Sequence, residues 1–428
     1  MIQPILMVGF LLATVAMLVV AVTSLAWMID SWRTPRAVGQ MPFPEPDEPR
    51  LSFSLLVPAR HEEAVLADTV RRLLRQDHPD FEVILIVGDD DPGTAAVAHE
   101  LAWTDDRVRV VVDDSVPKNK PKALNRALAH CTRQIVGVFD AEDEVAPGLL
   151  RHVDACFRAN RAHVVQGGVQ LMNYRSNWWS LRNTLEYFFW FSSRLHFHAR
   201  NGFVPLGGNT VFIRTDLLRL VEGWDVDCLA EDCELGIRLS VAGARVAVAY
   251  SAELATREET PPTLQGLIKQ RTRWNQGYLQ VLHRGEWRRL PTRSKRLMAR
   301  YLLAMPFMQA FSGLLVPMSL ATMLFFRAPM PFVLLTYVPL GATLATLVVE
   351  AVGLAEFNRM FGLRVRLRDY LKLVLGALPY QLLLAFAAIR ASVREIRGER
   401  GWEKTEHVGA HRGESLLEEQ LSLEGSVL

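Results

Sequence analysis

The stretch Leu51–Asp91, LSFSLLVPARHEEAVLADTVRRLLRQDHPDFEVILIVGDDD, alternates between two patterns. Its runs at 51–59 and 81–91 have the length and composition of buried strands, the second ending in acids, whereas 62–76 repeats its apolar residues at the spacing of an amphipathic helix. A second helical pattern and another strand, RVRVVVDD at 107–114, follow. Strands that alternate with helices in this way predict an α/β fold: a mostly parallel sheet with helices on both faces.

The composition narrows the class of protein. The chain has 428 residues, half of them hydrophobic, which suits a water-soluble domain joined to membrane helices. A formal net charge of +2 gives no sign of a nucleic-acid partner. The four cysteines contain no C-x-x-C pair, so neither a zinc site nor a disulfide framework is predicted, and free thiols suggest a reducing compartment.

The first 29 residues contain no charged side chain and are long enough to cross a bilayer. A secretory signal peptide is the alternative, but the apolar run is too long for one and no basic residue precedes it. Arg33 and Arg36 follow the run, which by the positive-inside rule places the next domain in the cytoplasm. We therefore predict an integral protein of the cell membrane, with a transmembrane helix at 1–29, a linker at 30–50 and a cytoplasmic domain at 51–290.

Further apolar runs follow this domain. Residues 301–326 and 328–349 carry no charge and predict a transmembrane hairpin. Residues 373–389 are also uncharged but shorter, and Pro379 interrupts them. A third full crossing would place the arginine-rich residues after 389 outside the cell, so either this segment is re-entrant or interfacial, or the number of crossings is different. The predicted units are transmembrane or interfacial helices at 297–390 and a polar tail at 391–428.

Residues 173–200, NYRSNWWSLRNTLEYFFWFSSRLHFHAR, are rich in aromatic rings with arginines beside them. This composition favours the interface between membrane and water, and it predicts at least one amphipathic helix against the bilayer. The alternative is a buried aromatic core.

Polar clusters end three of the predicted strands: Arg60–Glu63, Asp89–Asp91 and Asp140–Asp143. Functional groups in open parallel sheets collect at the carboxyl ends of the strands. In the third cluster, FDAEDE, Asp140 and Glu142 can converge on Mg²⁺ or Mn²⁺, whose other positions water and diphosphate oxygens would fill. The alternative is a turn with solvated acids.

Glu231 and Asp232 open a predicted helix within LAEDCELGIRL, residues 229–239. The plain interpretation is a pair of acids that the helix dipole stabilises at an N-terminus. The functional interpretation is a general base, because an aspartate fixed near a second carboxylate and a cleft can take a proton from an attacking hydroxyl.

Three more stretches carry candidate binding groups. KNKPKALN (118–125) has lysines, Lys120 among them, that suit a diphosphate, and PLGGNTVFIR (205–214) has glycines that allow close backbone approach to a ligand. Solvated lysines and an ordinary turn are the alternatives. QRTRWNQGYLQ (270–280) crowds arginines, amides and a tryptophan shortly before an apolar run. The alternative there is an ordinary amphipathic helix with snorkelling arginines.

Asp89–Asp91, FDAEDE, LAEDCELGIRL and QRTRW, in this order, resemble the motifs of family 2 glycosyltransferases, whose catalytic domain has the Rossmann-like GT-A fold. The resemblance covers about residues 50–290 with the flanking hydrophobic segments. It is strongest to the membrane-embedded branch that includes cellulose, hyaluronan, chitin and poly-N-acetylglucosamine synthases. It implies an inverting enzyme that uses a nucleotide sugar, with UDP expected, and a divalent cation, Mg²⁺ or Mn²⁺.

The resemblance also implies residue roles at the donor end. VPARHEE matches the family's first-strand signature, so Pro58, Ala59 and Glu62 would border the nucleotide, and Asp89 or Asp90 would hold its uracil or ribose end. DAED stands at the D-x-D position, so Asp140 would contact donor and metal. The second family aspartate is replaced here, which leaves Glu142 and Asp143 as alternatives for the second metal ligand.

At the acceptor end, AED stands where the family has T-E-D, which implies Asp232 as catalytic base beside Glu231. Gln270, Arg273 and Trp274 match Q-x-x-R-W. The arginine would meet the leaving diphosphate, whose charge grows as the sugar departs, and the tryptophan ring would offer an apolar face to an acceptor sugar.

Three functions follow as hypotheses. The first is transfer of a sugar from a nucleotide donor to a growing polysaccharide or lipid-linked acceptor in a β-linkage, with membrane lipid and possible export or synthase subunits as partners. The second is a single addition to a lipid acceptor, similar to ceramide glucosyltransferases. The third is a non-catalytic membrane subunit that binds nucleotide as a scaffold, which the replacement at Glu142 favours slightly.

Overall fold

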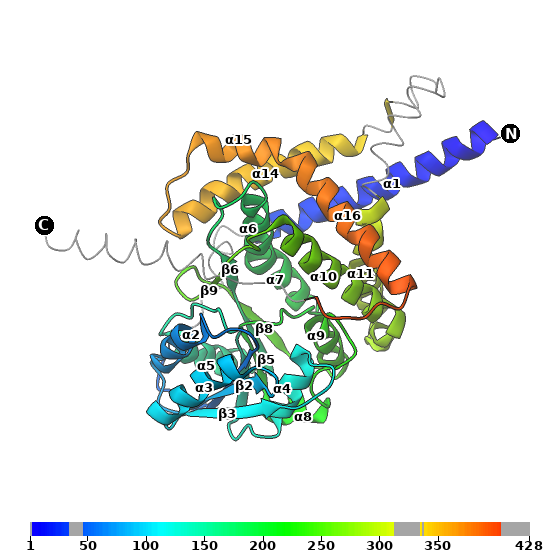
Figure 1. The fold of residues 1–428 in the computed structure, drawn as a ribbon. Coiled ribbons are helices and arrows are strands. Elements are labelled where there is room, and N and C mark those ends of the chain that lie inside the picture. Colours follow the sequence, from blue (N-terminus) through cyan, green and yellow to red (C-terminus); the bar gives the residue numbers. More distant parts are fainter. Residues whose placement is uncertain (1, 34–45, 312–333, 336–337, 404–428) are drawn as a thin grey trace, which may run out of the picture.

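A seven-stranded sheet forms the centre of the described part of the chain, residues 2–33, 46–311, 334–335 and 338–403, in this computed structural model (Figure 1). The strand order is β3-β2-β1-β4-β7-β5-β8, and β7 alone runs antiparallel to its neighbours in that sheet. The predicted α/β fold with a mostly parallel sheet is therefore confirmed. The strands are β1 Phe53–Ala59, β2 Phe81–Gly88, β3 Val108–Asp113, β4 Ile135–Val138, β5 Val164–Gly167, β7 Val211–Arg214 and β8 Val246–Ala249.

Helices cover both faces of the sheet, because successive residues of a strand point to opposite sides. In β1, Leu55 and Val57 belong to one buried cluster and Leu56 to the other. The first cluster includes residues of α2 Leu66–Leu74, α3 Pro92–Thr104 and α5 Leu149–Ala159. The second includes residues of α4 Lys120–Leu128, α8 Thr215–Leu220 and α9 Glu231–Val241.

The topology brings separate loops to one edge of the sheet. β1, β2, β3 and β4 are parallel, so the segments that follow them lie along the same edge. β7 runs the other way, so the segment before it, residues 205–210, reaches that edge as well. A small parallel sheet of β6 Val169–Leu171 and β9 Thr256–Glu258 extends the structure beyond β5.

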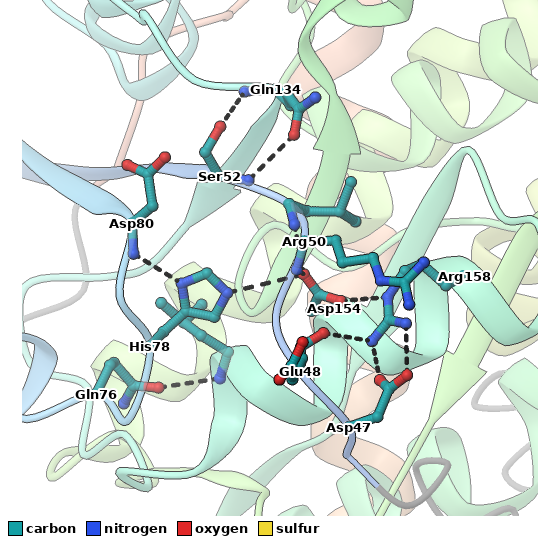
Figure 2. A network of polar contacts seen from close by, with 12 residues as sticks. Asp47, Glu48, Arg50, Ser52, Gln76, His78, Asp80, Gln134, Asp154 and Arg158 are labelled. Carbon is teal, nitrogen blue, oxygen red and sulfur yellow. Dashed lines mark hydrogen bonds and ion pairs between the residues drawn. The ribbon is translucent and has the colours of Figure 1, made fainter.

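Asp154 on α5 holds the chain where it enters the sheet (Figure 2). Its buried carboxylate accepts hydrogen bonds from the backbone N–H groups of Arg50, at 2.9 Å, and Leu51, at 2.6 Å. It also forms an ion pair with Arg158, and Nε2 of His78 lies 3.8 Å from it. These contacts fix the amino end of β1, the end away from the edge where the loops gather.

A second group of helices lies at the end of the molecule opposite β3 (Figure 1). α1 packs along α14, and α16 packs along α10. The indole N–H of Trp32 donates a hydrogen bond to Glu356 at 2.9 Å, and the Ser193 hydroxyl donates to the carbonyl of Trp27 at 2.6 Å. The bounds are α1 Ile2–Ile29, α10 Leu264–Arg284, α11 Arg293–Leu303, α14 Val338–Met360, α15 Leu367–Leu375 and α16 Ala377–Ile396.

Among the described residues, Val8–Ile29 is long and apolar enough to cross a membrane, and α15 with α16 would add a second span if counted as one bent helix. These two helices meet at 46° around Gly376. The expected interruption at Pro379 is wrong, because this proline lies in the first turn of α16, where a missing N–H breaks no helical hydrogen bond. Residues 312–333 and 336–337 of the predicted hairpin region lie outside the described residues. Its first residues, 301–303, belong to α11, and its last part, 338–349, belongs to α14.

The aromatic segment folds as α6 Ser180–Phe189, the π-helix η2 Trp190–Arg194 and α7 Leu195–Arg200. Phe188, Phe189 and Phe191 are buried, and Phe188 packs edge-on against Phe357 of α14 with ring centroids 5.9 Å apart. The alternative of a buried aromatic core therefore describes these rings. Contact of this segment with a bilayer stays a prediction.

Candidate active site

A cavity of about 700 Å³ runs from the carboxyl edge of the sheet to α1 and α11. Loops after the parallel strands, the segment before β7, the start of α9 and one face of α10 all contribute to its wall. Every residue that the sequence singled out for the site lines this cavity, except Asp89, Asp90 and Asp143. The lining residues among them are Pro58, Ala59, Glu62, Lys120, Asp140, Glu142, Glu231, Asp232, Gln270, Arg273 and Trp274.

Asp140 and Glu142 follow β4 and place two carboxylates in the cavity wall. Lys120 forms an ion pair with Asp140 and also donates to the Gly208 carbonyl at 3.0 Å. Burial and, after it, the neighbouring charges of Asp140 and Glu62 raise the pKa of Glu142 to about 8. The excess of negative charge around Glu142 is the property expected of a carboxylate that awaits a cation.

Asp143 has a different environment. Its side chain is fully buried, one oxygen accepts the backbone N–H of Asp140 at 2.8 Å, and the other accepts the Asn209 amide at 2.8 Å. Burial and the nearby Glu258 raise the pKa of Asp143. Asp143 therefore shapes the turn that presents Asp140, while Glu142 faces the cavity.

Glu231 and Asp232 form the first turn of α9, where the backbone N–H groups favour negative charge. Burial raises the pKa of Asp232, and burial with the adjacent Asp232 raises the pKa of Glu231 to about 7. The backbone of Gly208 passes so close that a Cβ there would lie 3.1 Å from Oδ2 of Asp232. The pair therefore faces the segment before β7 across the cavity.

The α10 residues Gln270, Arg273 and Trp274 share one helix face, because positions i, i+3 and i+4 are neighbours on a helix. Gly277 continues this face, and a Cβ at Gly277 would lie 2.5 Å from the backbone nitrogen of Ala230. The missing side chain thus lets α10 approach the start of α9 closely. This contact brings Arg273 to the carboxylates of α9.

Arg271 and Arg273 have separate partners. Arg271 forms an ion pair with Glu186 of α6 and lies over the Trp274 ring, 4.8 Å from its centroid. Arg273 lies 4.4 Å from the centroid of the Trp402 ring, in the segment after α16. Burial lowers the pKa of Arg273, and Glu231, Asp140 and Asp232 oppose that shift, so its positive charge lies within reach of the carboxylates of the cavity.

The donor end differs from expectation at Asp89 and Asp90. Asp89 pairs with Lys118 and Asp90 pairs with Arg60, and neither carboxylate lines the cavity. Asp113 and Lys118 line it instead. Asp113 is the last residue of β3, just as Asp140 lies directly after β4. Functional groups collect at the carboxyl ends of parallel strands, so Asp113 could have been singled out from the sequence in the same way.

Several lining residues come from segments that the sequence did not connect with the site. Trp27 belongs to α1, Tyr187 and Arg194 to the aromatic segment, and Trp402 to the end of the described chain. Their positions result from long-range packing, which local patterns do not encode.

Fold and site together define an α/β protein with acidic strand-end loops, a buried carboxylate pair and a fixed arginine around one cavity. Residues 49–277 match the family model described as "Glycosyltransferase like family 2". The chain belongs to this family, and the predicted family and GT-A fold are confirmed.

Curated relatives match the same region. The chain is 30% identical over 229 residues to a beta-monoglucosyldiacylglycerol synthase of Trichormus variabilis, covering 52% of this chain and 48% of that protein. It is 25% identical over 247 residues to a poly-beta-1,6-N-acetyl-D-glucosamine synthase of Staphylococcus epidermidis, covering 57% of this chain and 59% of that protein. The chain thus spans about half the length of the curated relatives it matches.

Among solved structures, the fold is similar to a mannosyltransferase of Pyrobaculum calidifontis in complex with GDP-Man and Mn²⁺. The TM-score is 0.54 at 19% identity, and the match covers 91% of this chain and 99% of that chain. This likeness concerns the fold.

Proposed function

We propose that the protein is an inverting glycosyltransferase of the membrane that moves a sugar from a nucleotide donor, UDP-linked, to an acceptor hydroxyl and forms a β-linkage. The observation that carries the proposal is the convergence of Asp140, Asp232 and Arg273 on one cavity. The candidate membrane helix Val8–Ile29, whose residue Trp27 lines the same cavity, supports an acceptor that comes from the membrane.

Asp232 is the proposed base. Burial raises its pKa, which makes its carboxylate a better proton acceptor than a solvated one. In the proposed step the acceptor hydroxyl gives its proton to Asp232, its oxygen bonds to the anomeric carbon, and the bond from that carbon to the nucleotide diphosphate breaks. Glu231 supports the base by its position in the same helical turn.

Lys120 and Arg273 are the proposed cations for the diphosphate. Both line the cavity, and both act electrostatically on the same carboxylates, Asp140, Glu231 and Asp232. Fixed cations at the position where charge develops stabilise the departing group without reorganisation. Pro58, Ala59 and Glu62 would border the nucleotide, and Trp274 would face the acceptor; all four line the cavity.

A divalent cation, Mg²⁺ or Mn²⁺, fits the residues present. The described residues contain no group of three or more His, Cys, Asp or Glu side chains able to hold a metal. Mg²⁺ nevertheless needs few protein carboxylates when a diphosphate supplies other oxygens, and Asp140 and Glu142 would hold it. The fold neighbour solved with Mn²⁺ supports this assignment. When bound, the cation would neutralise charge on the leaving diphosphate.

The relatives support two acceptor classes. One matched relative is named a glucosyldiacylglycerol synthase and another a polysaccharide synthase, so lipid and polysaccharide acceptors both belong to the proposal. A non-catalytic nucleotide-binding subunit is the remaining alternative.

The deciding experiment incubates membrane vesicles that contain the protein with a panel of radiolabelled nucleotide sugars and sizes the products. One labelled species in the lipid fraction indicates single addition, and a ladder indicates a polymer. Because a general base contributes about a hundred- to ten-thousandfold in rate, the Asp232→Asn variant should lose transfer by that factor while its UDP affinity stays nearly unchanged. Transfer at the wild-type rate in that variant would exclude Asp232 as the base.

A further inference from the structure

Arg194 is the last residue of the π-helix η2, and its guanidinium lines the cavity at the end formed by α1. The guanidinium carbon lies 4.2 Å from the centroid of the Trp27 ring and 5.3 Å from that of the Trp190 ring. Among the described residues, the buried Nε of Arg194 has no hydrogen-bond acceptor.

Stacking on the tryptophan rings stabilises the faces of the Arg194 guanidinium but supplies no hydrogen-bond acceptor for its N–H groups. A ring contacts the face of the guanidinium, whereas the five N–H donors lie in its plane and need acceptors at its edge. Glu186 is an acid whose charge acts on Arg194. However, Glu186 already accepts a hydrogen bond from Arg271 and another, at 3.0 Å, from the Tyr380 hydroxyl. A buried donor without an acceptor is costly, and Nε of Arg194 is such a donor among the described residues, so the position suits an anion.

A second unpaired donor lies next to the same ring. Among the described residues, the buried hydroxyl of Tyr301 on α11 has no hydrogen-bond partner, and the Tyr301 ring packs edge-on against Trp27 with centroids 5.7 Å apart. Arg194 and Tyr301 also act on each other electrostatically. Donors from two elements are therefore gathered around Trp27 without an acceptor.

Apolar side chains form much of the cavity wall that α1, α11 and the residues after α11 contribute, with Ser24 and Gln309 as polar residues among them. Met28, Leu302, Met305 and Pro306 line the same cavity. α1 continues from there with apolar side chains that face outward, among them Val22 at 50% exposure, and it is the candidate membrane helix. A ligand that fits this end has an anionic group attached to apolar chains.

We propose that the acceptor is an anionic lipid whose headgroup carries both a phosphate and a hydroxyl, with Arg194 binding the phosphate. This inference rests on the proposed glycosyltransferase function. Asp232, Tyr278 and Arg194 line the same cavity, and the charges of Asp232 and Arg194 both act on Tyr278. The phosphate would therefore bind at Arg194 while the headgroup hydroxyl reaches Asp232, and the chains would lie against Trp27 and Met28.

Three probes separate the parts of this ligand: dihexanoyl phosphatidylglycerol, dihexanoylglycerol, which has chains and a hydroxyl but no phosphate, and glycerol phosphate, which has no chains. Calorimetric titration of the full chain in detergent should give tight binding of the first probe and weak binding of the other two. The Arg194→Gln variant should bind phosphatidylglycerol about ten- to a hundredfold more weakly, since a charge-assisted hydrogen bond is lost. Dihexanoylglycerol binding should be equal in both proteins.

Arg300→Gln is the matched control, because Arg300 is an exposed arginine on the neighbouring helix α11, and it should leave all affinities unchanged. UDP titration of each variant measures the donor site separately. If the protein binds the lipid as expected but transfers no sugar, the proposed function is contradicted and the lipid site is not. If Arg194→Gln loses UDP binding through misfolding, Arg194→Lys replaces it, which keeps the charge and should show a smaller loss. Equal binding of lipids with and without phosphate, unchanged affinity in the Arg194 variants, or glycerol phosphate binding as tight as the lipid would overturn the inference.

Discussion

Arg271 and Arg273 illustrate how two residues of one type, two positions apart, differ in role. Both line the cavity, but Arg273 acts electrostatically on its carboxylates, whereas Arg271 joins α10 to α6 through Glu186. The Arg273→Gln variant should lose about a hundred- to a thousandfold in kcat, as expected when a fixed donor to a developing charge is removed. Steady-state kinetics with the active donor measures this loss.

Arg271→Gln serves as the comparison. It breaks an ion pair whose arginine is mostly buried and whose glutamate is partly exposed, and it should lower the free energy of unfolding by about 1–2 kcal/mol, seen as a lower thermal midpoint, before it affects chemistry. An Arg273→Gln enzyme with normal kcat, or equal effects of both substitutions on kcat and stability, would contradict this division of roles.

Asp140, Glu142 and Asp232 could be singled out from the sequence, because they belong to a strand end and a helix start that local patterns reveal. The structure places all three in the cavity wall, and their roles remain predictions. The sequence contained no sign that Asp89 and Asp90 pair with Lys118 and Arg60 away from the cavity wall, since these pairs depend on loop conformations. Arg194 was not predicted at all. Its position depends on contacts with α1, which lies far away in the chain.

At the scale of elements, the contact between α9 and α10 depends on Gly277. The Gly277→Ala variant should force the helices apart, because its Cβ would overlap the backbone of Ala230, and overpacking costs about 1–3 kcal/mol. The displaced Asp232 should reduce transfer at least tenfold, measured with the labelled donor, while UDP binding changes less.

Gly341→Ala is the control for this substitution. Gly341 is also helical, in α14, but a Cβ there would meet no atom within 4 Å. Alanine favours helices over glycine by about 1 kcal/mol, so this variant should be as stable as the wild type or slightly more stable. Equal loss of transfer in both variants would contradict the role of the close contact.

Helix α7 carries a pH-dependent contribution to stability. Burial and the nearby Arg194 lower the pKa of His198 to about 3, and burial with the nearby Arg200 lowers the pKa of His196 to about 4. The unfolded chain binds these protons near pH 6.5 and the folded chain does not, so stability is fully present above pH 6.5 and falls as the pH drops below it. The expected slope is about 1.4 kcal/mol per pH unit for each histidine.

His198→Phe tests this contribution. The phenylalanine ring fits among the rings of Trp27, Phe197 and Phe203 but cannot bind a proton. Thermal midpoints measured from pH 7.5 to pH 5 should fall less steeply in this variant than in the wild type. Parallel curves for the two proteins would contradict the assignment.

The elements themselves were predictable to different degrees. The strands and helices of 51–114 follow directly from apolar spacing, and the structure has them where the pattern indicates. The break at Gly376 was expected at Pro379, because a proline pattern does not reveal whether the residue lies inside a helix or in its first turn. The antiparallel β7 has no local signal, since strand direction depends on the whole topology.

At the scale of the whole molecule, helix α1 packs against other helices of the protein and also forms part of the cavity wall. Trp27 is buried in a cluster with residues of α9 and α11, and Asp30 pairs with Arg200. Deletion of residues 2–33 should therefore lower the thermal midpoint and the transfer rate in detergent, where no membrane anchor is needed. UDP affinity should remain, because residues proposed to border the donor, such as Glu62 and Asp140, follow β1 and β4 and do not belong to α1.

The control for this deletion is the triple substitution of Val15, Val19 and Val22 by leucine on the outward side of α1, which should leave stability in detergent unchanged. If the protein that lacks residues 2–33 had the thermal midpoint and the transfer rate of the wild type, α1 would be a membrane anchor that has no part in the site.

The π-helix at Trp190–Arg194 has one more consequence. Such a wide turn corresponds to a single extra residue within an otherwise α-helical segment. Removing one residue, for instance Ser192, would restore regular winding and rotate everything after it by about 100° relative to α6. Arg194 would then leave the cavity and another side chain would take its place. Insertion or deletion of a single codon could in this way change the acceptor specificity during evolution.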